Sequence, residues 1–206
     1  MTSDNHDPQW NYGGSVWSRF DNELGASTPG CSVEDWKCVR STAYLYPGNT
    51  TLTNQEAAAY QSEGFELALH LTTDCTTPTR GEYADMLAEQ RSALADAYPD
   101  LDPSVTNRNH CIAWVGYTDV PDEEANVGIH LDTNYYYWPP DWVNHQPGVF
   151  TGSGFPQRFS TVDGRLIDVY QATTQMTDES GQSYPSTVDA LLGAALGSEG
   201  FYGAFV

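Results

Sequence analysis

The chain has 206 residues, of which 28 are acidic and 8 basic, so its formal net charge is −20 at pH 7. Such a charge repels nucleic acids and anionic membrane surfaces, and we expect neither as a partner. No apolar run approaches the roughly 18 to 20 residues of a membrane-spanning helix, whereas 39% hydrophobic residues are enough for a globular core. We interpret residues 1–206 as one domain with the acidic surface of a secreted or salt-tolerant protein.

Short elements are expected first along the chain. Residues 16–24 and 32–40 have the composition of short helices, and residues 43–46 (AYLY) that of a short strand ended by Pro47. The chain opens on polar residues and closes on an apolar segment, residues 201–206, with no outgoing loop. We therefore expect a fragment of a longer protein that has other domains.

A helix-to-strand step follows. Thr53 and Glu56 have the spacing of a capping box, which predicts a helix that ends with Gly64 as its C′ residue. Residues 65–71 form a short apolar run of the kind found in buried parallel strands, and His70 stands at its end. Polar side chains at the carboxyl ends of such strands are where α/β folds place their chemistry.

The remaining elements continue the alternation of helix and strand. They are expected, in order, as a helix from Thr79 to about Tyr98, a strand at 112–115, a helix at 121–126, a strand at 127–131 ending on Asp132, a hairpin of 158–160 with 166–170 around Asp163-Gly164, a helix at 186–196 and a strand at 201–206. This order predicts the α/β class with a parallel sheet, of which a barrel is one form.

The four cysteines, Cys31, Cys38, Cys75 and Cys111, lack the C-x-x-C spacing of zinc sites. An even number of cysteines in an acidic, Tyr- and Trp-rich chain favours two disulfides and an extracellular location. Four cysteines permit three pairings, of which we favour Cys31–Cys38 with Cys75–Cys111, because each pair would lie in neighbouring elements. Free buried thiols are the alternative.

Several polar segments stand near predicted strand ends in a recognisable order. They are residues 2–5 (TSDN), 64–70 (GFELALH), 70–74 (HLTTD), 107–110 (NRNH) and 127–139 (VGIHLDTNYYYWP). In that order they resemble the T-F-D-D motif, the G-H-E-I-A-x-H strand, the H-S/T-x-x-H motif, the arginine motif and the G-Y-x-x-D-S-S-x-x-P segment of the polysaccharide deacetylases. That family is carbohydrate esterase family 4, with the NodB-homology fold.

The resemblance implies a fold and an activity. The fold would be a deformed (β/α) barrel of the NodB-homology type, incomplete at both ends. The activity would be that of a secreted, metal-dependent hydrolase that removes acetyl groups from N-acetyl sugars of an extracellular polysaccharide or oligosaccharide. The cofactor would be a divalent metal ion, with zinc as the first expectation and cobalt or another divalent ion as alternatives.

The resemblance also implies roles for individual residues. Asp4 would be the general base, Arg108 would orient it, and Asn5, His70 and Asp74 would hold the metal. A bound metal polarises the amide carbonyl and activates water, while a carboxylate takes the proton of that water. For substrate binding we expect His110, Asp132, Tyr135 and Trp138, the two aromatic rings stacking on sugar faces.

The sequence departs from the family pattern at several positions. Asn5 replaces the second aspartate, Asp74 the second histidine and Leu71 a hydroxy residue. His6 or Asp7 could act as a ligand in place of Asn5. The late general-acid histidine of the family has no counterpart at the end of the chain.

These departures favour an alternative function, a non-catalytic carbohydrate-binding domain with an eroded metal site. A third interpretation is a glycoside hydrolase that uses two carboxylates without a metal. It would need an acid pair at strand ends, such as Asp132 with Asp168.

Overall fold

The computed structural model describes residues 2–5, 16–46, 51–110, 114–134 and 156–172, together with residues 189, 193 and 196–198. For residues 2–5, 16 and 17 it describes the backbone alone. The chain divides into two compact units, Met1–Gly116 and Tyr117–Val206. The α/β class is confirmed, while the barrel type and the single-domain interpretation stay predictions. Among the described helices, none combines the length and the apolar character that crossing a membrane requires.

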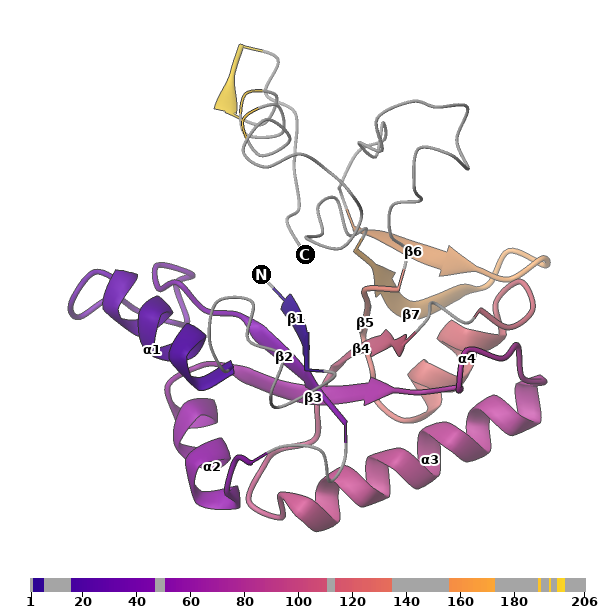
Figure 1. The fold of residues 1–206 in the computed structure, drawn as a ribbon. Helices are drawn as coiled ribbons and strands as arrows, with labels where there is room; N and C mark the ends of the chain where they lie inside the picture. The colour runs from indigo at the N-terminus through magenta and orange to yellow at the C-terminus, as the bar shows by residue number, and fades with distance from the viewer. Residues whose placement is uncertain are drawn as a thin grey trace. The chain divides into compact units, whose positions relative to one another are not determined.

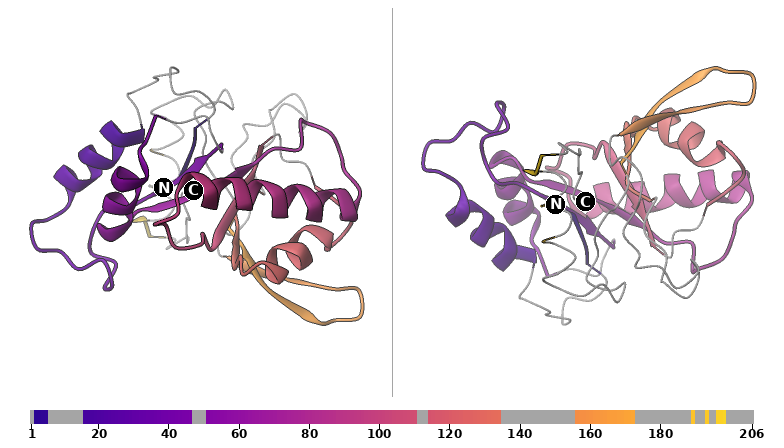
Figure 2. Two further views of the ribbon diagram at one scale, coloured as in Figure 1. Left: turned by 90° about the horizontal axis from the view of Figure 1, so that it is seen from below. Right: turned by 90° about the horizontal axis from the view of Figure 1, so that it is seen from above.

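Unit 1 is built on four parallel strands joined by helical connections. The strands are β1 (Thr2–Asn5), β2 (Thr42–Leu45), β3 (Glu66–Leu71) and β4 (Thr106–Asn109), side by side in chain order, and the helices between them are α1 (Val16–Ala26), α2 (Asn54–Ser62) and α3 (Arg80–Ala97). Helices α2 and α3 lie on the same side of the strands (Figures 1 and 2). Because the strands are parallel, all four carboxyl ends lie at one edge of the sheet.

The helix side of the sheet is apolar. Leu67, Leu69 and Leu71 alternate along β3 and are at most 2% exposed. Tyr83 and Leu87 of α3 are also buried. Each such leucine contributes on the order of 2 kcal/mol through burial. The apolar run read from the sequence is therefore the central strand of unit 1.

Both predicted capping boxes are present. The Thr53 hydroxyl accepts a hydrogen bond from the Glu56 N–H while the Glu56 carboxylate accepts one from the Thr53 N–H, and Thr79 and Glu82 repeat this at α3. Gly64 follows α2 with a φ of +94°, the left-handed conformation expected of a C′ residue. A Cβ at Gly64 would also come within 2.7 Å of Val33.

The helix expected at 32–40 is wrong. Residues 33–36 form a turn, and Trp36 has a φ of +58°, which no α-helix accommodates. The Cys31–Cys38 disulfide closes this loop, as predicted. Cys75 is also disulfide-bonded, while its expected partner Cys111 lies outside the described residues.

The strand expected at 112–115 is also misplaced. The fourth strand is β4, at Thr106–Asn109, where a polar connection was expected. Trp114 and Val115 are not in a strand, and residues 111–113 lie outside the described residues. The error has a physical cause, because β4 buries asparagines that bond to one another and therefore lacks an apolar pattern.

Unit 2 contains α4 (Asp119–Asn126), β5 (Leu131–Asp132), β6 (Gln157–Ser160) and β7 (Leu166–Gln171). Strand β5 pairs with β7 in parallel, and β6 and β7 form the predicted antiparallel hairpin, with Gly164 at a φ of +86° in its turn. The strand expected at 127–131 is shorter, because residues 127 and 128 belong to a turn after α4. Of the helix expected at 186–196, only residues 189, 193 and 196 are described, and they are helical. The strand expected at 201–206 lies outside the described residues.

Candidate functional site at the carboxyl edge of unit 1

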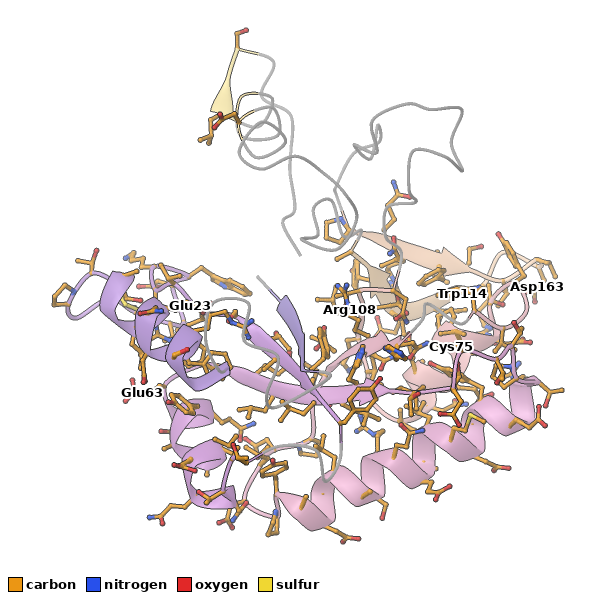
Figure 3. All side chains as sticks on the ribbon, in the orientation of Figure 1. Glu23, Glu63, Cys75, Arg108, Trp114 and Asp163 are labelled. Atoms are coloured by element: carbon orange, nitrogen blue, oxygen red, sulfur yellow. A yellow bond between two sulfur atoms is a disulfide. The ribbon has the colours of Figure 1, made fainter. Side chains whose placement is uncertain are left out.

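The side of the unit 1 sheet that faces away from α3 is polar. We call this the polar face of unit 1, and it carries Thr42, Tyr44, Glu66, His70, Thr106 and Arg108. Arg108, labelled in Figure 3, projects from β4 on this side. The Tyr44 hydroxyl donates to Thr106 Oγ1 at 3.0 Å across the width of β3. Strands β2 and β4 therefore contribute polar side chains that meet over β3.

Glu66 ties three strands of the polar face together. Its carboxylate accepts hydrogen bonds from the Thr42 hydroxyl on β2 and from the N–H and hydroxyl of Thr106 on β4. It also accepts one from the Val105 N–H. These four hydrogen bonds to one carboxylate hold β4 against β3.

His70 is buried on this face, with an exposed fraction of 1%. Its Nδ1 lies 2.9 Å from the carbonyl oxygen of Arg108, the residue that pairs with it on β4. A carbonyl only accepts, so Nδ1 is the donor, and in the neutral ring Nε2 carries the lone pair. The Nε2 atom is shielded from solvent. This is how a protein fixes the tautomer of a metal-binding or base histidine.

Three rings gather at the carboxyl edge. The centroid of His70 lies 5.0 Å from that of Tyr46 and 5.4 Å from that of His110, and the Tyr46 and His110 centroids are 5.8 Å apart. Tyr46 directly follows β2 and His110 directly follows β4. The strand ends thus bring two imidazoles and a phenol from distant parts of the sequence into contact. We call these three residues the ring cluster.

A buried polar network supports β4 from the other side. The Tyr83 hydroxyl of α3 accepts hydrogen bonds from the side-chain amides of Asn107 and Asn109 at 3.4 and 3.3 Å, and Asn107 Nδ2 donates to Asn109 Oδ1 at 2.9 Å. All three residues are at most 3% exposed. This network holds the strand that carries Arg108 and His110.

The expected base Asp4 and the expected metal ligand Asn5 do not both fall on the polar face of unit 1. In backbone register, Asp4 falls in one row with Tyr44 and Ala68, and Asn5 in the next row with Leu45 and Leu69. Only the first row belongs to the polar face, and β1 is two strand spacings, about 10 Å, from β3. The side chains of Asp4 and Asn5 lie outside the described residues.

Asp74 differs from His70 in its exposure to solvent. It is exposed and has a φ of +51° in the turn after β3. Within the described part of the chain, no group of three or more His, Cys, Asp or Glu side chains could hold a metal ion. The metal assignment of Asn5, His70 and Asp74 therefore stays a prediction.

Asp132, in unit 2, is fully buried at the end of β5. Its two carboxylate oxygens accept hydrogen bonds from the N–H and the side-chain amide of Asn134 at 2.8 and 2.7 Å, and its carboxyl also hydrogen-bonds to that of Glu124. Burial raises the pKa of Asp132 above its usual 3.8, and these hydrogen bonds oppose the rise. The carboxyls of Asp132 and Glu124 therefore form a buried, hydrogen-bonded pair within unit 2.

Asp132 and Asp168, the acid pair given as an example for a metal-free glycoside hydrolase, do not come together. Asp132 pairs with Gln171 of β7, whereas Asp168 alternates to the opposite face of that strand. Asp168 is exposed and bonds to Arg158 at 3.2 Å and His130 at 3.5 Å. The two carboxylates therefore cannot act on one glycosidic bond.

Unit 1 also contains a cavity of about 260 Å³ between β3 and the end of α3. Leu67, Leu94 and Tyr98 line it, with Arg91 at its wall. Burial lowers the pKa of Arg91, whose guanidinium donates to the Ser104 carbonyl at 3.3 Å. This cavity is on the α3 side of the sheet, away from His70.

Tyr46 and Glu124 were missed by reasoning from sequence. Tyr46 stands at the end of a predicted strand, as His70 does. A search for polar side chains at the end of every predicted strand would therefore have found it. Glu124 lies inside a predicted helix and carries no such signal. The predicted substrate residues Tyr135 and Trp138 lie outside the described residues.

The chain was compared with models of known protein families and with curated protein sequences. Neither comparison found a match.

Proposed function

We propose that unit 1 carries the active site of a metal-dependent hydrolase that removes acetyl groups from an extracellular polysaccharide. The observation that carries the proposal is His70, near the carboxyl end of β3, whose Nδ1 donates to the Arg108 carbonyl so that Nε2 carries the lone pair of the neutral ring. Asp4 stands two strands away in a row of the same face. The deformed barrel of the NodB-homology type is part of this proposal.

A divalent metal, zinc or cobalt, would polarise the acetyl carbonyl and lower the pKa of water when bound. Asp4 would take the proton from the attacking water, and Arg108 would orient Asp4. The water oxygen bonds to the carbonyl carbon, the C–N bond breaks, and the amine leaves with a proton. The products are acetate and the free amino sugar.

The cysteines support the proposed location. The described residues contain the Cys31–Cys38 disulfide and a disulfide-bonded Cys75. Disulfides persist in oxidising compartments. They support an extracellular place of action, where an acetylated polysaccharide would be the partner.

A carbohydrate-binding domain without catalysis is the second candidate function. The exposed position of Asp74 favours the binding domain. Without Asp74, only two of the three expected metal ligands, Asn5 and His70, would remain. Both candidates use the same polar face and the same class of ligand.

A measurement of acetate release distinguishes the hydrolase from the carbohydrate-binding domain. The full chain, stripped with a chelator and reloaded with Zn²⁺ or Co²⁺, would be incubated with N-acetylated chitin oligosaccharides. We expect metal-dependent acetate release that falls at least 100-fold in His70→Ala. His130→Ala, which removes an exposed imidazole of unit 2, is the matched control and should retain activity. Retention of polysaccharide without acetate release would support the binding domain instead.

A further inference from the structure

The turn after β3 separates Asp74 from His70. The Thr73 hydroxyl donates to the Thr76 carbonyl at 3.1 Å, the Thr76 N–H donates back to the Thr73 carbonyl at 3.0 Å, and Thr73 itself is 1% exposed. Asp74 and Cys75 both have positive φ values, +51° and +58°. Residues i and i+4 share a face only in a helical segment, and this segment is not helical.

The structure brings a different side chain to His70. The rings of His70 and His110 have centroids 5.4 Å apart. Two imidazoles that bind one tetrahedral zinc ion, with Zn–N bonds of about 2.0–2.1 Å, place their ring centroids about 5 Å apart. The observed centroid spacing is close to that value.

His70 is buried and His110 is half-buried, which agrees with this role. His70 Nε2 and His110 Nδ1 are both shielded from solvent. Tyr46 contacts both rings and limits their rotation. The Arg108 carbonyl sets the tautomer of His70, as a backbone carbonyl does behind many metal-binding histidines.

We propose that His110, and not Asp74, is the second protein ligand of a divalent metal ion that His70 binds at the carboxyl edge of unit 1. This inference rests on the proposed function for the chemistry that the ion would supply, but the ligand pair can be tested without any substrate. Neutral imidazoles favour zinc and cobalt over calcium and magnesium, which prefer oxygen ligands. The site would therefore select Zn²⁺ or Co²⁺ over Ca²⁺ or Mg²⁺.

The test measures Co²⁺ binding to the full chain by calorimetry and by the visible absorption of the bound ion. We expect the dissociation constant to rise at least tenfold in His70→Ala and in His110→Ala, with loss of the absorption band. Asp74→Ala and the control His130→Ala should stay within twofold of the parent chain. His110→Gln, which keeps the size and polarity of the side chain, replaces His110→Ala if circular dichroism shows that the latter is unfolded.

Each result decides the proposal. Unchanged binding in a folded His110 variant, loss of binding in Asp74→Ala, or no Co²⁺ binding by the parent chain would overturn it. Failure of the proposed function looks different, because Co²⁺ binding would then depend on His70 and His110 although no acetylated substrate released acetate. Metal-dependent acetate release that survived His110→Gln would instead retain the hydrolase and reject His110 as a ligand.

Discussion

The Nδ1 atom of His70 lies 2.9 Å from the backbone carbonyl oxygen of Arg108 on the neighbouring strand. Because the acceptor belongs to the backbone, the orientation and tautomer of His70 do not depend on the Arg108 side chain. The same residue can therefore serve the site twice, through its carbonyl as a support for His70 and through its guanidinium as a charge on the polar face. The two contributions can be separated by mutation.

Arg108→Ala removes the charge and keeps the carbonyl. We expect Co²⁺ affinity to stay within about twofold, while kcat/KM for acetate release falls at least tenfold, equivalent to about 1.4 kcal/mol of transition-state stabilisation. Calorimetry and acetate assays on the same preparation check both values. Loss of metal binding together with activity would mean that the guanidinium supports the fold of the edge and not the reaction.

Tyr83→Phe removes the hydroxyl that accepts from Asn107 and Asn109 in the core. The hydrogen bonds are long, so we expect a loss of about 1 kcal/mol in the free energy of unfolding, at the low end of the range for an unsatisfied buried group. Urea denaturation followed by circular dichroism measures it. Tyr60→Phe is the matched control, because its hydroxyl bonds to Asp21 in an exposed setting, and its effect should be close to zero.

Thr79→Ala removes the side-chain half of the capping box of α3. The Thr79 hydroxyl accepts from the Glu82 N–H at 3.3 Å, and N-cap substitutions of this kind typically cost about 1 kcal/mol. Thermal unfolding should show a lower midpoint for Thr79→Ala and a nearly native one for Thr79→Ser, which keeps the hydroxyl. Equal losses in both variants would show that the threonine methyl, and not the cap, stabilises the start of the helix.

Asp132→Asn should change how stability depends on pH. The pKa of Asp132 is raised in the folded chain because burial disfavours the charged carboxylate, so the folded state binds more protons than the unfolded state. The stability that this group contributes is fully present below its ordinary pKa of 3.8 and is lost as the pH rises through the raised value. We expect the urea midpoint of the parent chain to fall more steeply above pH 4 than that of Asp132→Asn.

Asp168→Asn is the control for this experiment, because it removes the same charge from an exposed position. Its pH profile should run parallel to that of the parent chain. A parallel profile for Asp132→Asn as well would show that the buried carboxyl does not titrate differently in the two states.

The fold was predictable where local chemistry is strong. The two capping boxes, Gly64 after α2, the apolar run of β3 and the Asp163-Gly164 turn are short patterns whose energetics act over a few residues. Strand β4 was misplaced because its buried side chains are asparagines. Their burial depends on Tyr83, 24 and 26 residues away, which no local pattern records.

The sequence by itself determined the α/β alternation and the position of His70 at the end of a buried strand, and it favoured the local Cys31–Cys38 disulfide. Only the tertiary structure decided which groups meet there, because strand register, and not spacing along the chain, sets the neighbours of a side chain in a sheet. Asp74 is four residues from His70 and turns into solvent, whereas His110 is forty residues away and lies against it. Parallel pairing of β3 with β4 makes that contact, since it brings two strand ends to the same edge.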